Sequence, residues 1–173
     1  MHTNTITTFR DLFELLPEAL QDRVFGLCKV PQRLDYHPEG NTLKHTIIVV
    51  ERAIRLGNIN LILAALFHDV GKDETFELSS KGFPTAHGHE KVSGRLVIEY
   101  RSFIRSLGGN PVVVYFIVRH HMRMKRFDEM RKSKRVKLMD NPSYDILKVF
   151  SLIDRGGRDI LTEEEKYYRH FMV

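Results

Sequence analysis

The chain has 173 residues, 42% hydrophobic and 28% charged, and its 27 Lys and Arg outnumber its 22 Asp and Glu to give a net charge of +5. This length suggests one domain with a single core, and the composition excludes a wholly disordered chain. A lone cysteine excludes an internal disulfide and a thiolate metal cluster, and the absence of a long apolar run or a signal-like start predicts a cytoplasmic protein with no membrane contact.

The first third of the chain is predicted to be mostly helical. Apolar spacing indicates two short helices within residues 8–28, with Pro17 in the first turn of the second. Prolines and a glycine mark a loop at 30–40. The next helix is expected to run over about 42–56, capped by Asn41 or Thr42.

The segment Leu61–Val70 is apolar on all sides, which is typical of a central, buried helix, and Asn60 is expected to cap it. Residues 77–86 contain Gly and Pro and are expected to form a loop, followed by a long helix over about 89–107.

The run Val112–Val118 favours a strand by residue preference, but its Asn-Pro start and helical neighbours favour a helix, which we predict. Asn141-Pro142 is expected to open another helix, and a capping box predicts a last helix at 163–172. We therefore expect an all-α fold of about seven to nine helices in one domain over 1–173.

His68 and Asp69 end the most apolar predicted helix, where a buried imidazole and carboxylate are costly unless they are paired or bind a metal. A core histidine beside a capping aspartate is the simpler alternative. Three other predicted helices direct similar side chains inward: His89 begins one, His121 ends one, and Asp154 continues an apolar stripe. Helical bundles build metal sites in this way.

The order of these residues resembles that of the HD-domain metal-dependent phosphohydrolases, and most closely the HD domain of bacterial tRNA nucleotidyltransferases. The resemblance covers about residues 31–159. The matching segments are His-Pro-Glu-Gly-Asn-Thr-Leu-Lys-His-Thr (37–46), Leu-Ala-Ala-Leu-Phe-His-Asp-Val-Gly-Lys (63–72), His-Gly-His-Glu (87–90), Val-Arg-His-His-Met-Arg (118–123) and Asp154 with Gly157-Arg158.

The resemblance implies an HD-domain helical bundle with a buried site for one or two divalent transition-metal ions, Mn, Fe, Ni or Co, with Mg or Zn as alternatives. The metal ligands that it implies are His45, His68, Asp69, His89, His121 and Asp154, with His120 as a further candidate. Adjacent histidines differ by about 100° around a helix, so only one of His120 and His121 should face the metals squarely.

The implied activity is metal-dependent hydrolysis of phosphate esters in nucleotides or RNA ends, such as 2′,3′-cyclic phosphates or 2′-nucleotides. The catalytic residues implied are Asp69, Lys72 and His87, and the substrate-binding residues are Lys72, His120, Arg123 and Arg158. One alternative is a mononucleotide or signalling-nucleotide phosphohydrolase. Another is a non-catalytic nucleic-acid-binding module with a structural metal. The chain lacks the nucleotidyltransferase motifs, so we expect a stand-alone HD domain that does not add nucleotides.

The positive charge is concentrated in one segment, residues 119–137, where nine Lys and Arg meet two acids to give +7. The rest of the chain carries −2. This basic segment is either a solvated loop or a guide that draws polyphosphate or RNA toward the metals. The second interpretation predicts an RNA contact that weakens with salt.

Overall fold

The computed structural model describes residues 6–35 and 37–155, and most of these residues are helical. The elements in chain order are α1 (Phe9–Glu14), α2 (Glu18–Gly26), the 3₁₀ turn η1 (Leu27–Lys29), α3 (Thr42–Leu56), α4 (Ile59–Phe67), α5 (Lys72–Thr75), β1 (Glu77–Leu78), β2 (Pro84–Thr85), α6 (His89–Glu99), α7 (Arg101–Ser106), α8 (Pro111–Met124), α9 (Lys132–Met139) and α10 (Tyr144–Ile153). The all-α prediction is confirmed. The segment over which the strand and helix preferences conflicted is helical, within α8.

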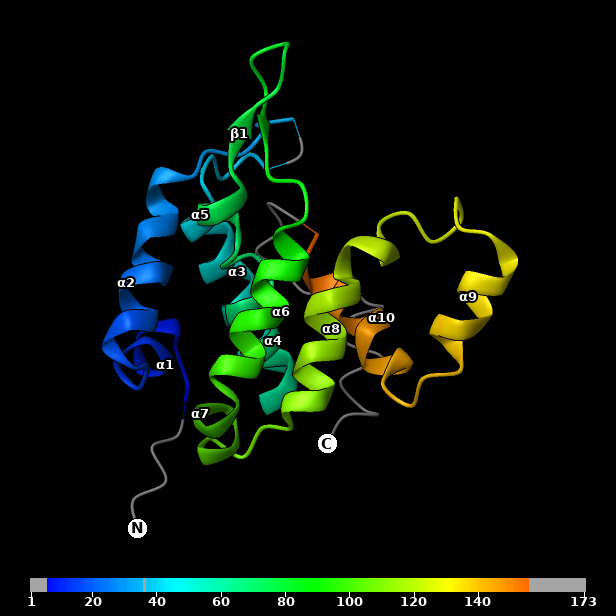
Figure 1. Ribbon diagram of the computed structural model, residues 1–173. Helices are drawn as coiled ribbons and strands as arrows, with labels where there is room; N and C mark the ends of the chain where they lie inside the picture. The colour runs from blue at the N-terminus through cyan, green and yellow to red at the C-terminus, as the bar shows by residue number, and fades with distance from the viewer. Residues whose placement is uncertain (1–5, 36, 156–173) are drawn as a thin grey trace.

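Helix α4 forms the centre of the bundle. Every residue from Leu61 to Phe67 is buried, and the helix packs against α3, α6, α8 and α10. Figure 1 shows α6 and α8 side by side in front of it. Its start differs from the prediction, because Asn58 caps it by accepting from the backbone N–H of Asn60 and Leu61. The Asn60 side chain instead accepts from the backbone N–H of Asn110, the cap of α8.

The turn after α4 meets the start of α6 with no spare room. A Cβ added to Gly71 would lie 2.6 Å from the carbonyl oxygen of His89 and 2.7 Å from the Cβ of Val92. The backbone N–H of Gly71 donates to the hydroxyl of Ser93, 3.0 Å away. A glycine at this position therefore lets the residues that precede it lie against α6.

The end of α4 also differs from the prediction, since the helix stops at Phe67 and not at Val70, and three other boundaries are wrong. The long helix expected over 89–107 bends at Tyr100, where α6 ends and α7 begins, with the Tyr100 ring packed on Phe67. The expected loop at 77–86 contains the antiparallel hairpin β1–β2. The helix expected to open at Asn141-Pro142 begins at Tyr144. The helix predicted at 163–172 lies outside the described residues.

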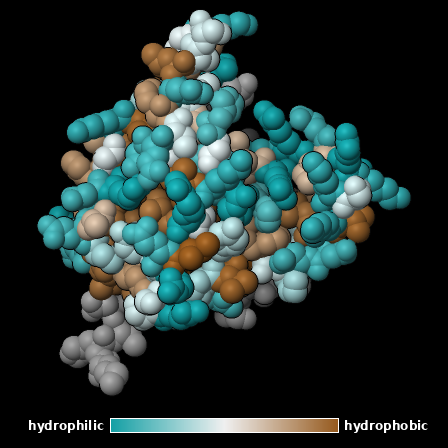
Figure 2. Space-filling view, in the orientation of Figure 1, coloured by the Kyte–Doolittle hydropathy of each residue, from teal (hydrophilic) through white to brown (hydrophobic). Residues whose placement is uncertain are grey.

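Helix α9, which was not predicted, follows α8 and precedes α10 in the chain, and it stands apart from the bundle at the right of Figure 1. Its only buried residue is Leu138, so a single side chain ties it to the core. Hydrophilic side chains dominate this part of the surface in Figure 2. Within the described ranges, no helix combines the length and the apolar character needed to cross a bilayer.

Candidate metal centre

Six buried side chains from five parts of the bundle meet beside the C-terminal end of α4. His45 comes from α3, His89 from the first residue of α6 and His121 from the last turn of α8. His68 and Asp69 follow α4, and Asp154 follows α10. The exposed fraction of each of these six residues is 4% or less. The structure thus brings together every metal ligand expected from the resemblance, apart from the alternative His120.

One side of the cluster is formed by two histidines and two carboxylates. The Nε2 of His45 lies 2.9 Å from Oδ1 of Asp154 and 3.8 Å from Oδ2 of Asp69. The Nε2 of His68 lies 3.2 Å from the same Asp69 oxygen and 3.4 Å from Asp154 Oδ1. His45, His68 and Asp69 are spaced closely enough to hold one metal ion.

Asp69 also belongs to a second group on its other side. Its Oδ1 lies 3.2 Å from Nε2 of His89 and 3.9 Å from Nε2 of His121. These three residues are likewise spaced to hold an ion. Because its two oxygens face different histidine pairs, the Asp69 carboxylate lies where it can bridge two ions.

Backbone carbonyls fix the orientation of three of these rings. The Nδ1 atoms of His68, His89 and His121 lie 2.8, 2.8 and 2.7 Å from the carbonyl oxygens of Ala65, Ala86 and Val118. A carbonyl only accepts, so each Nδ1 carries a proton and each ring turns its Nε2 into the cluster. This is how metal-binding histidines are commonly held.

The donor set fits a cation. The Nε2 atoms of His89 and His121 lie 3.2 Å apart and both face Oδ1 of Asp69, an arrangement of donor atoms that a positive ion would stabilise. Burial lowers the pKa of His121 well below its ordinary value. Burial would lower the pKa of His68, but the Asp69 and Asp154 carboxylates raise it to about 9. The surroundings of this ring are therefore strongly negative. Imidazole with carboxylate suits Mn, Fe, Co, Ni and Zn.

Glu39, in the loop before α3, is a part of the centre that the sequence reasoning missed. Its Oε1 lies 2.6 Å from Nδ1 of His45 and 3.2 Å from Nδ1 of His37, and its side chain is 4% exposed. Burial would raise the pKa of Glu39, but the hydrogen bonds from His45, from its own backbone N–H and from His37, together with the charge of His45, lower the pKa to about 2. Glu39 is therefore a charged acceptor that orients His45. The only signal for it was its place within the matching segment 37–46.

Two lysines lie against the two central carboxylates. The Nζ of Lys72 is 2.7 Å from Oδ2 of Asp69 and 3.0 Å from the side-chain oxygen of Gln32. The Nζ of Lys125, which the sequence did not single out, is 3.0 Å from Oδ2 of Asp154. Burial would lower the pKa of Lys125, but the carboxylates of Asp154 and Asp69 raise it, so the ammonium stays charged. Each carboxylate thus has a cation at the edge of the cluster.

Arg52, a fully buried residue of α3, fixes the backbone around Asp154. Its Nη1 donates to the carbonyl oxygens of Ile153 and Arg155 at 2.9 and 2.6 Å. This bridge holds the end of α10 against α3, the helix that carries His45. This role could not be predicted, because an arginine in an amphipathic helix is normally expected on its exposed face.

The remaining predicted residues lie around the cluster. His120 points away from it and packs its ring edge on Phe116, with the ring centroids 4.7 Å apart. His87 is exposed beside His89, and Arg123 is exposed on α8. Arg158 lies outside the described residues. Of the two adjacent histidines, the structure therefore brings His121 and not His120 to the other ligands.

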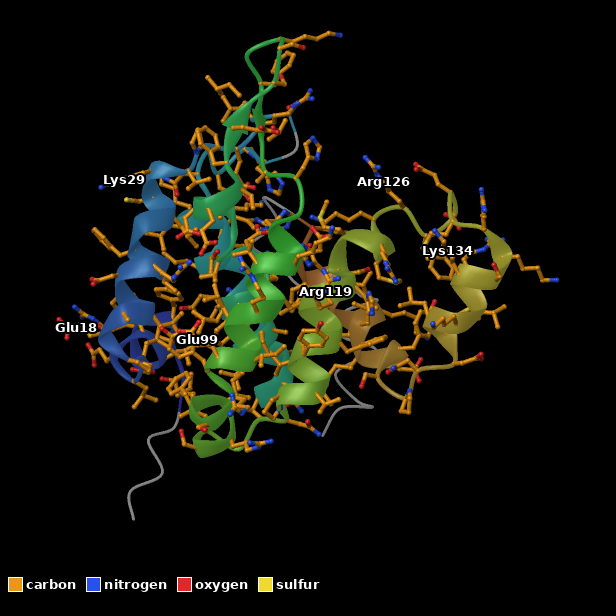
Figure 3. The ribbon with its side chains drawn as sticks, in the orientation of Figure 1. Glu18, Lys29, Glu99, Arg119, Arg126 and Lys134 are labelled. Atoms are coloured by element: carbon orange, nitrogen blue, oxygen red, sulfur yellow. The ribbon has the colours of Figure 1, made fainter. Side chains whose placement is uncertain are left out.

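Two cavities flank the cluster. One of about 500 Å³ opens beside His89 and is lined by five basic residues and one acid: Lys91, Arg119, Arg123, Arg126, Lys134 and Glu90. Figure 3 shows Arg119 on α8, Arg126 just after it and Lys134 across from them on α9. A smaller cavity of about 170 Å³ is lined by Gln32, His37 and Lys72, among others. The basic segment 119–137 thus borders the larger cavity.

Comparisons with known proteins agree with the resemblance found in the motifs. The family model described as HD domain matches residues 42–154. The multifunctional CCA protein of Dechloromonas aromatica (strain RCB) is 35% identical over 130 residues, which cover 75% of this chain and 30% of that protein. The multifunctional CCA protein of Methylobacillus flagellatus is 34% identical over 121 residues, 69% of this chain and 28% of that protein. The chain thus spans less than a third of these relatives. No solved structure matches it.

Proposed function

The chain belongs to the HD domain family, and from this membership and the geometry of the cluster we propose that it is a metal-dependent phosphohydrolase acting on nucleotides or RNA ends. The observation that carries the proposal is the position of Asp69. Its two oxygens face two separate pairs of buried histidine nitrogens. A purely structural metal needs one closed set of ligands, whereas a bridging carboxylate serves a two-ion hydrolytic centre.

In this proposal two sets of residues hold the ions. His45, His68, Asp69 and Asp154 hold the first, and Asp69, His89 and His121 hold the second. When bound, divalent ions at such a site supply Lewis-acid activation of water and of phosphoryl oxygens. Mn, Fe, Ni or Co suits the mixed imidazole and carboxylate donors best.

The side chains around the ligands have roles of their own. Lys72 lies at the edge of the cluster and lines a cavity, so its ammonium can offset charge on a phosphoryl group there. The ammonium of Lys125, 3.0 Å from Oδ2 of Asp154, instead balances the charge of that carboxylate. His87 is exposed next to the larger cavity, where an imidazole can give a proton to a leaving oxygen.

The substrate class follows from the charge of the larger cavity. Five basic side chains against one acid favour a ligand with phosphate groups. Arg123 belongs to this wall, and Arg119 is held there by an ion pair with Glu90 at 3.7 Å. The curated relatives are named multifunctional CCA proteins, which makes an RNA end the first substrate to test. A free mononucleotide or signalling nucleotide is the alternative.

The test is metal analysis of the purified protein, followed by hydrolysis assays with Mn, Ni, Co or Fe. Bis-p-nitrophenyl phosphate, a 2′,3′-cyclic mononucleotide and a 5′-mononucleotide serve as substrates. We expect bound metal and hydrolysis by the wild type, and loss of both in Asp69→Ala. Asp73→Ala, which removes a carboxylate on α5 outside the cluster, should retain both. Metal binding without hydrolysis of any substrate would support the non-catalytic alternative, and a preference for the 5′-mononucleotide would support the other.

A further inference from the structure

Besides the two cavities beside the metal centre, one of about 490 Å³ lies between α8 and α9. We call it the second cavity, because it adjoins the one that opens beside His89. Arg123 and Lys134 line both this cavity and the one that opens beside His89. The two cavities are therefore neighbours that share a positively charged wall. None of the proposed metal ligands lines this second cavity, so the metal centre does not account for it.

The inner surface of the second cavity is partly apolar and aromatic. Phe116 and His120 lie one turn apart on α8 with their rings edge to face, and Leu138, the one buried residue of α9, lines the cavity with them. A nucleobase is flat and apolar on its faces and stacks on aromatic side chains with little sequence preference. A surface that only held phosphate would need no such lining.

His120 also presents an unused polar atom. Its Nδ1 is buried and has no hydrogen-bond partner among the described residues. A ring nitrogen that has no partner among these residues is available to the hydrogen-bonding edge of a base.

The charged residues of the second cavity are all basic. Arg123, Lys134 and Lys137 line it, and no carboxylate is among the described residues that line it. Arg123 and Lys134 lie on the wall that separates it from the cavity beside His89, where a chain that occupied both cavities would place its connecting phosphate. The aromatic and apolar lining of the second cavity suits a base, and the basic side chains of the shared wall suit a phosphate. Together they fit two consecutive nucleotides.

We propose that the cavity between α8 and α9 binds the nucleotide next to the terminal one of a single-stranded RNA, so that the substrate is an RNA end rather than a free mononucleotide. This inference rests on the proposed phosphohydrolase function for the terminal phosphate. Binding of the neighbouring base can nevertheless be measured without catalysis.

The binding test uses protein treated with EDTA and a 5′-fluorescein-labelled triadenylate with a 3′-phosphate. A second probe has the same backbone but lacks the penultimate base. We expect the wild type to bind the complete probe about tenfold more tightly, as loss of one stacked base would give. His120→Ala should remove most of this preference. Lys137→Gln should weaken both probes, while Lys132→Gln, the same charge change at an exposed position of α9 outside the cavity, should weaken neither.

A kinetic test follows with the metal-loaded protein and two substrates, a 2′,3′-cyclic mononucleotide and a dinucleotide ending in the same group. We expect a higher kcat/KM for the dinucleotide, and a ratio that falls in His120→Ala and Lys137→Gln but not in Lys132→Gln. Circular dichroism checks that each variant is folded, and His120→Gln provides a second variant that retains hydrogen-bonding groups.

The outcomes separate the two proposals. Equal binding of the complete and abasic probes, or equal kcat/KM for both substrates, overturns the second nucleotide site and leaves the phosphohydrolase function standing. A wild type that prefers the complete probe but hydrolyses no substrate overturns the proposed function and retains the base site.

Discussion

Removing the charge of Glu39 should weaken metal binding without unfolding the protein. Its carboxylate accepts from Nδ1 of His45 at 2.6 Å and is almost completely buried. Because its pKa is lowered to about 2, the acceptor is charged at neutral pH. A charged acceptor fixes the ring and increases the electron density at Nε2, the atom that faces Asp154.

The magnitude follows from the kind of bond that is lost. Glu39→Gln keeps the size of the side chain and one acceptor oxygen but removes the charge. Changes in such partners lower metal affinity about 10- to 100-fold. The bond to His45 is short and charge-assisted, and bonds of this kind are about twice as strong as neutral ones. We therefore expect a loss of about 30-fold, which corresponds to about 2 kcal/mol.

The assay is competition for Co²⁺ or Mn²⁺ against a chelator of known affinity, with Glu77→Gln, an exposed residue of β1, as the matched control. Phosphodiesterase activity should return toward the wild-type value when the variant is saturated with metal, because the other ligands stay in place. An unchanged affinity would refute the orienting role of Glu39. A loss of activity that saturating metal does not restore would refute it equally, and would indicate general damage to the fold.

Three further predictions concern the adjacent histidines, the packing at α4 and the N-terminal cap. His121→Asn should reduce bound metal from two ions to one while His120→Asn retains both, as counted by elemental analysis; equal losses would contradict the assignment. Gly71→Ala should lower the free energy of unfolding by about 2 kcal/mol in urea denaturation, because the new methyl group meets backbone atoms, whereas Gly26→Ala, with open space, should lower it little; equal effects would exclude the close contact as the cause. Asp11 caps α1 and has a pKa lowered to about 2, from 3.8, by its hydrogen bonds from Thr7, so its contribution is complete above the unfolded pKa and disappears as the pH falls through the folded one. The stability difference between wild type and Asp11→Asn should accordingly shrink between pH 4 and pH 2, and a constant difference would show that the charge is not what stabilises the cap.

The helices could be predicted where caps and apolar spacing agree. Asn41 caps α3 as expected, and Asn110 with Pro111 starts α8 although its valines favour a strand. Helix α9 could not be predicted in this way, because its one buried residue produces no apolar stripe. The interruption at Tyr100 was missed for a different reason, since the apolar spacing continues through it and its ring contact with Phe67 joins parts of the chain that are distant in the sequence.

The site could be predicted as far as its residues show chemistry locally. His68 and Asp69 end an apolar helix, and a costly pair in such a place is visible in the sequence. The choice between His120 and His121 depends on the rotation of α8, which a spacing pattern fixes only coarsely. Glu39 and Lys125 were missed because each is defined by a partner in another element, Glu39 by His45 and Lys125 by Asp154.

Lys125 changes the interpretation of the basic segment 119–137. From the sequence its nine basic residues form one block of charge that could only be assigned to solvent or to a phosphate ligand. In the structure they divide into two groups with different surroundings. The Lys125 side chain is 40% exposed, but its ammonium lies against a carboxylate that is 1% exposed, so salt screens this pair less than it screens Arg126 and Lys134, which line an open cavity. One part of the segment therefore balances the charge of the metal centre, and only the other part is free to attract a phosphate chain to it.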